Sequence, residues 1–309
     1  MSVASGATST RPVDVTATTT ASPYRLLWND FAESRIALVG LLVVLLIALL
    51  ALFAPWIAPQ NPYDLGQVSV LDSRLPPGES SMDGYTFWLG TDGAGRDLWS
   101  AILYGLRVSL SVGLMSGFLA LMIGMVIGLI AAYAGGKTDM LIMRLVDIQL
   151  AFPAVLIALI LLAILGKGID KIIVALIAVQ WAYYARTVRS AALVERGKDY
   201  VEAATCLGLS HSRILFRHIL PNCLPPMIVV GTVQTASAIA LEATLSFLGV
   251  GLPQTEPSLG LLIANGFEYM LSGRYWIAVF PGVALLITIV SINLVGDQLR
   301  DILNPRLQR

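Results

Sequence analysis

Charged residues, cysteine and histidine are scarce in this sequence. Asp, Glu, Lys and Arg make up only 13% of the 309 residues, two residues are Cys, two are His, and the formal net charge is zero. This balance argues against a protein that binds nucleic acid or another polyanion. Apolar residues are abundant instead, at 56%, and the mean hydropathy of +0.76 is well above that of a soluble domain. These values predict a membrane protein.

Six stretches are apolar and long enough, or nearly so, to cross a bilayer, which takes about 20 helical residues. They are residues 36–57, 108–134, 140–165, 170–189, 224–248 and 276–297. The first begins too far from Met1 and runs too long for a typical cleaved signal, so we expect an uncleaved first span. The sequence therefore predicts an all-α polytopic membrane protein with six transmembrane helices.

The Lys and Arg residues predict the orientation of these spans. An even number of spans puts both termini on one side, and with a cytoplasmic N-terminus most of the 20 Lys and Arg residues lie inside. We expect four parts, with both termini cytoplasmic. They are a disordered tail (1–24), a first helix with an extracytoplasmic segment (25–103), a five-helix core (104–298) and a C-terminal tail (299–309).

Residues 131–138, AAYAGGKT, have the spacing of a relaxed phosphate loop. A phosphate loop needs a buried strand ahead of its glycine-rich turn, and here an apolar span precedes it. Small residues along that span let neighbouring helices approach closely. They are Gly113, Gly117, Gly124 and Gly128. We therefore expect Gly135 and Gly136 to end a helix in a tight cytoplasmic turn, without a nucleotide site.

The connection between the fourth and fifth predicted spans, residues 190–222, is long and basic. Asp199 followed by Glu202 is a variant of a capping box and predicts the start of a short helix. Glu202 also suits the positive end of that helix. Ala203 and Ala204 would give the helix a flat face that another protein can approach.

The same connection carries signals for a second short helix. Gly208 can supply the left-handed residue that ends the first helix, and Ser210 can cap a second one, which Pro221 interrupts. Cys206, His211, His218 and Cys223 have ligand chemistry that suits zinc. Structural zinc sites usually bring their cysteines in close pairs, so we expect no metal site and reduced cysteines. The connection is therefore predicted to form a two-helix elbow in the cytosol.

The predicted extracytoplasmic segment holds a charged, glycine-rich loop. Asp92, Arg96 and Asp97 stand there beside glycines that include Gly95. No nucleophile and base accompany them, so we expect an ion-paired structural role. The following residues, 101–110, are expected to form an interfacial helix.

Several polar side chains fall inside the predicted spans, where they are costly unless they face protein or water. They include Arg144, Asp147, Gln149, Gln180, Gln234 and Glu242. We expect Arg144 to pair with Asp147, three residues further along one helical face. Glu242 is the best candidate for a transport pathway, and hydrogen bonding between helices is its equal alternative.

Four stretches resemble the permease subunits of binding-protein-dependent ABC importers. Glu202, Ala203, Ala204, Gly208, Leu220 and Pro221 have the spacing of the EAA loop of these permeases, with Asp199 just before it. Residues 88–110, 135–153 and 241–253 are similar to the C-type subunit of the dipeptide, oligopeptide and nickel subfamily.

The resemblance implies a type I importer permease fold in a bacterial inner membrane. It also implies a homologous permease as heterodimer partner, two ATPase subunits that bind ATP and Mg²⁺, and an extracytoplasmic solute-binding protein. This chain would have no cofactor and no ATPase activity of its own, and residues 199–208 would be the coupling helix that docks on an ATPase. Di- or oligopeptides are the expected solute, and nickel or another small solute is the alternative.

A secondary transporter is the alternative from another class. It would show weak internal repeats and broken helices at the bilayer midplane, and no convincing repeat is present in the sequence. A membrane-embedded enzyme would need paired His or acidic motifs within spans, whereas both histidines lie in the elbow. The dependence of uptake on ATP would separate these classes.

Overall fold

The computed structural model describes residues 23–64, 66–81, 84–253, 255–256 and 258–303. In these ranges the chain is helical and forms no β-strand beyond two isolated bridges, so the predicted all-α class is confirmed. The helices are α1 (Pro23–Glu33), α2 (Arg35–Leu52), α3 (Ala54–Ile57), α4 (Leu98–Ala134), α5 (Gly136–Ala151), α6 (Ala154–Leu165), α7 (Ile169–Arg196), α8 (Asp199–Cys206), α9 (His211–Ile214), α10 (Leu220–Phe247), α11 (Leu259–Phe267) and α12 (Trp276–Leu303). Three short turns join them, the 3-10 turns η1 (Val70–Asp72) and η3 (Met270–Ser272) and the π-turn η2 (Leu215–Ile219).

Four helices of the described chain are long and apolar enough to cross a membrane. They are α2, α4, α12 and the continuous helix His211–Phe247, which comprises α9, η2 and α10. The bent pair of α5 and α6 makes a fifth span if the two are counted together. The remaining predicted span, residues 170–189, lies in α7, which is long enough at 28 residues but not apolar enough for the same criterion.

The predicted span 140–165 is broken in the structure. α5 ends at Ala151, α6 begins at Ala154, and the two helices meet at 91°. Phe152 has an extended backbone with φ −87° and ψ 144°. A proline disfavours the helical conformation of the residue before it, so Pro153 explains the break within an otherwise apolar run.

Two predicted boundaries also move. The expected interfacial helix 101–110 is the first part of α4, which has 37 residues and is about 55 Å long. This length exceeds the roughly 30 Å of a hydrocarbon core, so α4 extends beyond it. Of the predicted tails, residues 1–22 and 304–309 lie outside the described residues, while 23–24 belong to α1 and 299–303 to α12.

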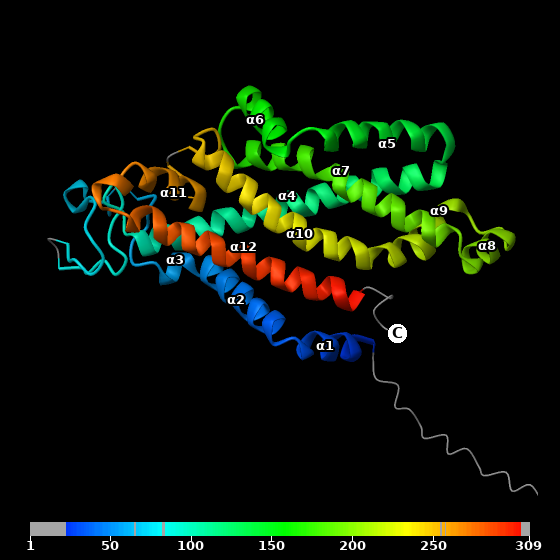
Figure 1. Ribbon diagram of the computed structural model, residues 1–309, viewed down its shortest axis with the longest axis horizontal. Helices are drawn as coiled ribbons and strands as arrows, with labels where there is room; N and C mark the ends of the chain where they lie inside the picture. The colour runs from blue at the N-terminus through cyan, green and yellow to red at the C-terminus, as the bar shows by residue number, and fades with distance from the viewer. Residues whose placement is uncertain (1–22, 65, 82–83, 254, 257, 304–309) are drawn as a thin grey trace, which may run out of the picture.

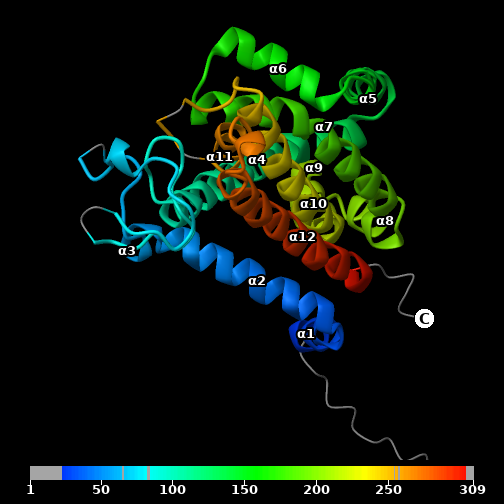
Figure 2. The same ribbon diagram turned by 60° about the vertical axis from the view of Figure 1, so that its left-hand side comes forward.

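The long helices lie side by side along the longest axis of the molecule (Figures 1 and 2). α10 packs against α4, α7 and α12, and α2 packs against α12. α5 and α6 pack against α7 on its side away from α12 and α2 (Figure 2). The loops before α4 gather with α11 at one end of the bundle, and α8 and α9 form the opposite end (Figure 1).

Glycines let α4 approach α7 closely, as the sequence predicted. A Cβ at Gly124 would lie 2.5 Å from the Cβ of Tyr184 in α7, and a Cβ at Gly128 would lie 2.5 Å from the Ala185 carbonyl oxygen. No larger residue fits at either position without moving α4 away from α7.

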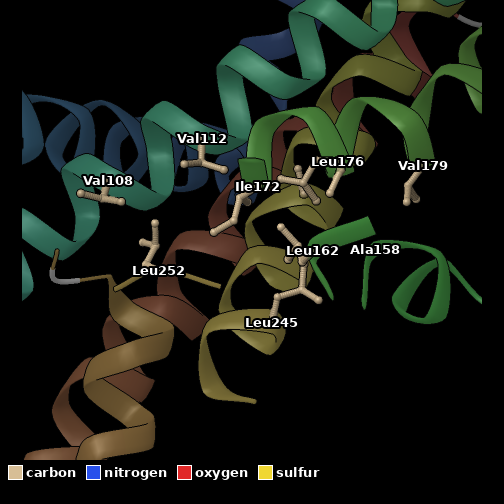
Figure 3. Packing of buried hydrophobic residues seen from close by; sticks show 11 residues of the cluster. Val108, Val112, Ala158, Leu162, Ile172, Leu176, Val179, Leu245 and Leu252 are labelled. Atoms are coloured by element: carbon tan, nitrogen blue, oxygen red, sulfur yellow. The ribbon is translucent and has the colours of Figure 1, made fainter. Parts of the chain in front are cut away.

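The apolar layer shown in Figure 3 lies where α4, α6, α7 and α10 meet. Val112, Leu162, Ile172, Leu176 and Leu245 are among its buried side chains. Many apolar side chains of α2 and α6 face outward instead and stay exposed. In a bilayer such faces contact lipid or another membrane protein.

Candidate functional site

The predicted elbow is present at the end of the bundle, with α8 as its outer helix (Figures 1 and 2). α8 begins at Asp199, and Lys198 occupies the N-cap position without a side-chain cap bond. The predicted capping box is therefore wrong, because Asp199 is already helical and cannot serve as the cap. Asp199 and Glu202 both lie in the first turn, where negative charge stabilises the helix.

Gly208 ends α8 as predicted. Its φ is +70°, in the left-handed region that favours glycine. The amide of Gly208 donates to the Thr205 carbonyl at 3.0 Å, and the amide of Leu209 donates to the Ala204 carbonyl at 3.2 Å. These bonds close the end of the helix and turn the chain toward α9.

The second helix of the elbow does not stop at Pro221, which corrects the prediction. α9 continues through η2 into α10 as one helix, His211–Phe247. In η2 the Leu220 amide donates to the carbonyl of Leu215, five residues back. Pro221 then falls in the first turn of α10, where a missing N–H is tolerated. The elbow is consequently joined to the fifth predicted span by a continuous helix.

The two alanines of the motif face different ways. Ala204 is 5% exposed and packs with Val201 against buried side chains of α4 and α7. Ala203 and Glu202 are exposed, and so is Leu207 at 80%. Because Ala204 is buried against the bundle while Ala203 is exposed, the two alanines cannot both form the predicted flat face. Ala204 belongs to the interior, and Ala203 is free to meet another protein.

A hydrogen-bond network that the sequence did not predict holds the elbow to the bundle. The carboxylate of Glu195, at the end of α7, accepts from Lys198 Nζ at 2.6 Å and from the Tyr200 hydroxyl at 2.6 Å. Asn222 in α10 donates to the Tyr200 oxygen at 3.1 Å and to the His218 carbonyl at 2.7 Å. One tyrosine thus connects α7, α8 and α10, which we call the Tyr200 network.

The protonation states of Tyr200 and Glu195 keep this network intact at neutral pH. Burial and the hydrogen bond to Glu195 raise the pKa of Tyr200 to about 12, so its hydroxyl keeps the proton that it donates. Burial alone would raise the pKa of Glu195, but the bonds from Lys198 and Tyr200 hold it below its usual value. The carboxylate therefore remains charged as an acceptor.

The turn at Gly135 meets the elbow. Gly135 (φ +61°) ends α4, and a helix rather than a strand precedes it, so the predicted tight turn is confirmed. Arg196 donates to the carbonyls of Ala132 at 3.0 Å and Tyr133 at 3.3 Å, at the negative end of α4. The Tyr133 hydroxyl also contacts the ring nitrogen Nδ1 of His211.

Ion pairs join α5 to α7, but not as expected. Asp147 pairs with Arg186 of α7 rather than with Arg144, because α7 lies directly beside α5. Asp139 also binds Arg189 of α7 through two bonds of 2.6 Å. The predicted Arg144–Asp147 pair is therefore wrong.

The buried polar residues of the spans form bonds between helices. Glu242 of α10 is fully buried and accepts from Ser109 of α4 at 2.9 Å and from Ser246 at 2.8 Å. Gln180 donates to the Gln234 carbonyl at 3.0 Å, and Gln149 donates to the Ala178 carbonyl at 2.8 Å. For Glu242 the geometry agrees with the alternative of hydrogen bonding between helices.

The described residues between α3 and α4 form a compact loop region, which we call the outer cap. Asp92 accepts from the amides of Ala94 at 2.9 Å and Arg96 at 3.0 Å, and its other oxygen pairs with Arg96 Nε at 2.7 Å. Gly95 has φ +85°, and a Cβ there would lie 2.1 Å from the Ser69 carbonyl oxygen. The ion pair expected from the sequence is thus formed within a tight turn.

Asp97 caps α4 at the end of the same turn. Its carboxylate accepts from the Ser100 amide at 2.9 Å and from the Ser100 hydroxyl at 2.5 Å. Gln60 accepts from the Asp97 amide at 2.6 Å and so ties the first part of the loop to the helix. Burial raises the pKa of Asp97, while the bonds from Ser100 oppose that rise.

This arrangement of helices is that of a type I ABC importer permease. The inward-facing MetNI methionine ABC transporter contains a chain that matches with a TM-score of 0.55 at 21% identity, over 65% of this chain and 96% of that one. A family model described as the inner membrane component of binding-protein-dependent transport systems matches residues 124–309, and one described as the N-terminal domain of oligopeptide transport permease C matches residues 22–77. The chain belongs to this family of binding-protein-dependent transport permeases.

Similar proteins cover nearly the whole chain. A di/tripeptide transport system permease of Pseudomonas aeruginosa (strain UCBPP-PA14) is 40% identical over 287 residues, 93% of each chain. A putative peptide transport system permease of Brucella suis is 43% identical over 93% of each chain. An oligopeptide transport system permease of Bacillus subtilis is 37% identical over 92% of this chain and 91% of that one.

Proposed function

We propose that this permease carries short peptides into a bacterial cell, as one of two homologous permeases that form the pathway. The relatives with peptide transport in their names match more than nine tenths of the chain, which supports peptides over nickel as the solute. An extracytoplasmic solute-binding protein would deliver the peptide, and two ATPase subunits would hold ATP and Mg²⁺.

The exposed side of α8 is the observation that supports this function best. Glu202, Ala203 and Leu207 form an outward surface on a helix that stands at the end of the bundle (Figure 1). A small residue between an acid and a large apolar residue suits a groove on a soluble partner. We infer that this partner is an ATPase subunit and that this end of the bundle, with both termini, faces the cytoplasm.

Movement of α8 would reach the membrane helices by two connections. The Tyr200 network links α8 to α7 and α10 through side chains. The continuous helix from His211 onward links the elbow to α10 through its backbone. ATP-driven closure of the ATPase pair would then change the packing of α10 against α4, provided that α8 contacts the ATPases differently in the two states.

Uptake by the assembled importer tests this proposal. In proteoliposomes that contain all partner subunits, we expect uptake of a radiolabelled dipeptide that requires ATP, and no ATP-dependent uptake of Ni²⁺. Glu202→Lys reverses the charge on the exposed side of α8 and should lower peptide uptake at least several-fold with an unchanged amount of permease in the membrane. Peptide uptake without ATP, or full uptake by Glu202→Lys, would contradict the proposal.

A further inference from the structure

A cavity of about 710 Å³ lies at the end of the bundle opposite to α8. Its walls come from three regions, two parts of the outer cap that include Tyr63 and Arg96, and residues around α11 that include Thr255 and Glu268. Figure 1 shows these regions gathered at that end. Its volume is in the range of about 300–1,000 Å³ that is typical of small-ligand pockets.

Arg96 gives this cavity a directed donor. The residue is 9% exposed and lines the cavity. Its Nε is bound to Asp92, whereas the two terminal nitrogens have no hydrogen-bond partner among the described residues. A guanidinium offers five N–H donors in a flat fork that matches a carboxylate. The Asp92 bond fixes the plane of this fork and leaves its outer edge available to a ligand.

The other polar groups of the wall suit a short peptide. Burial, followed by the negative charge of Glu256, raises the pKa of Tyr63 to about 12, so its hydroxyl stays protonated and can donate. Asn265 adds an amide that can both donate and accept. Glu268 supplies a carboxylate that suits an ammonium group. The cavity therefore offers groups for both charged ends of a peptide.

We propose that this cavity is a subsite for the C-terminal carboxylate of a short peptide, with Arg96 as the bidentate donor. The proposal rests on the peptide transport function and adds a residue that selects the chemical end of the substrate. Asp92 is a positioning residue, because it orients the guanidinium. Both of its carboxylate oxygens are already bonded to Arg96, one to the amide and one to Nε.

The test compares a tripeptide with its C-terminal amide in the complete reconstituted importer. The affinity of the isolated binding protein for each peptide is measured first, so that its own preference can be divided out. The wild type should prefer the free carboxylate by about ten-fold or more beyond that preference, because a bidentate charged bond is lost with the amide. Arg96→Gln should reduce this extra preference to about one.

Two variants control the experiment. Arg274→Gln removes an arginine elsewhere at the same end, outside the cavity wall, and should keep the wild-type preference. Arg96→Lys keeps the charge beside Asp92 but lacks the fork, so it should retain only part of the preference. This variant also serves if Arg96→Gln fails to assemble.

Three results would overturn the subsite. In the first, the wild type imports both peptides without extra preference. In the second, Arg96→Gln keeps the preference. In the third, Arg96→Gln lowers the uptake of both peptides equally, because a higher concentration of the binding protein is needed for half-maximal uptake. The third result would mean that Arg96 pairs with an acidic side chain of the docked binding protein and does not bind the peptide. If the wild type imports no peptide at all, the proposed function fails, and the subsite fails with it.

Discussion

Tyr200 connects three helices through one hydroxyl group. It donates to Glu195 at the end of α7 and accepts from Asn222 in α10, while its own backbone belongs to α8. A hydrogen bond to a charged group contributes about 1.5–3 kcal/mol, which is enough to hold a short helix against its neighbours. The residue is thus placed to transmit a displacement of α8.

Replacing Tyr200 by Phe should uncouple the importer. We expect fewer peptides transported per ATP hydrolysed, by about three-fold or more, while the ATPases still assemble with the permease. The ring remains, so packing is preserved, and only the bonds of the hydroxyl to Glu195, Asn222 and the His218 carbonyl are lost. Uptake and ATP hydrolysis are measured on the same proteoliposomes.

Tyr183→Phe is the matched control for this change, since Tyr183 is half-exposed on α7 and no hydrogen bond of its hydroxyl is present among the described residues. It should behave as the wild type. A Tyr200→Phe importer with an unchanged ratio of peptide to ATP would show that the network is structural only.

Single residues differed in how well the sequence predicted them. Gly208 could be predicted, because a left-handed helix end strongly favours glycine and leaves a local signal. Tyr200 and Asn222 could not, because a bond between side chains 22 residues apart has no characteristic spacing. Asp147 shows the same limit, since helical spacing favoured Arg144 and the actual partner, Arg186, lies on another helix.

α4 and α7 pack closely against each other, and glycine makes this possible. Gly124→Ala should lower the melting temperature of the purified permease by several degrees, because its Cβ would meet Tyr184 Cβ at 2.5 Å and the Trp181 carbonyl oxygen at 2.6 Å. Gly282→Ala in α12 is the control, since nothing lies within 4 Å of its Cβ position. The control should be neutral or slightly stabilising, by up to about 1 kcal/mol. Equal melting temperatures for both variants would refute the close packing.

The sequence predicted the presence of the long helices better than the irregularities within them. Apolar length revealed α2, α4 and α12 directly. It did not reveal the break at Pro153 or the π-turn before Pro221, because hydropathy averages over a window and is insensitive to a single missing N–H. Both irregularities follow from proline, and they have opposite results, a sharp bend in one case and a continuous helix in the other.

The whole molecule has two distinct ends. The outer cap carries buried charges that are fixed by their own turn, and the elbow carries an exposed surface on α8 (Figure 1). The resemblance of the sequence to importer permeases identified both regions, but only the structure separated the inward-facing Ala204 from the outward-facing Ala203. For α8 to couple the permease to ATP hydrolysis, it must face the cytoplasm and be covered by an ATPase.

The two cysteines provide the most direct measurement of this requirement. Cys206 lies on α8 and is exposed, whereas Cys223 is buried. In inside-out vesicles that contain the permeases without ATPases, a membrane-impermeant maleimide should label the wild type and not Cys206→Ser. Addition of the ATPase subunits should slow this labelling about ten-fold or more. Labelling from the extracytoplasmic side, or an unchanged rate with the ATPases bound, would contradict the account.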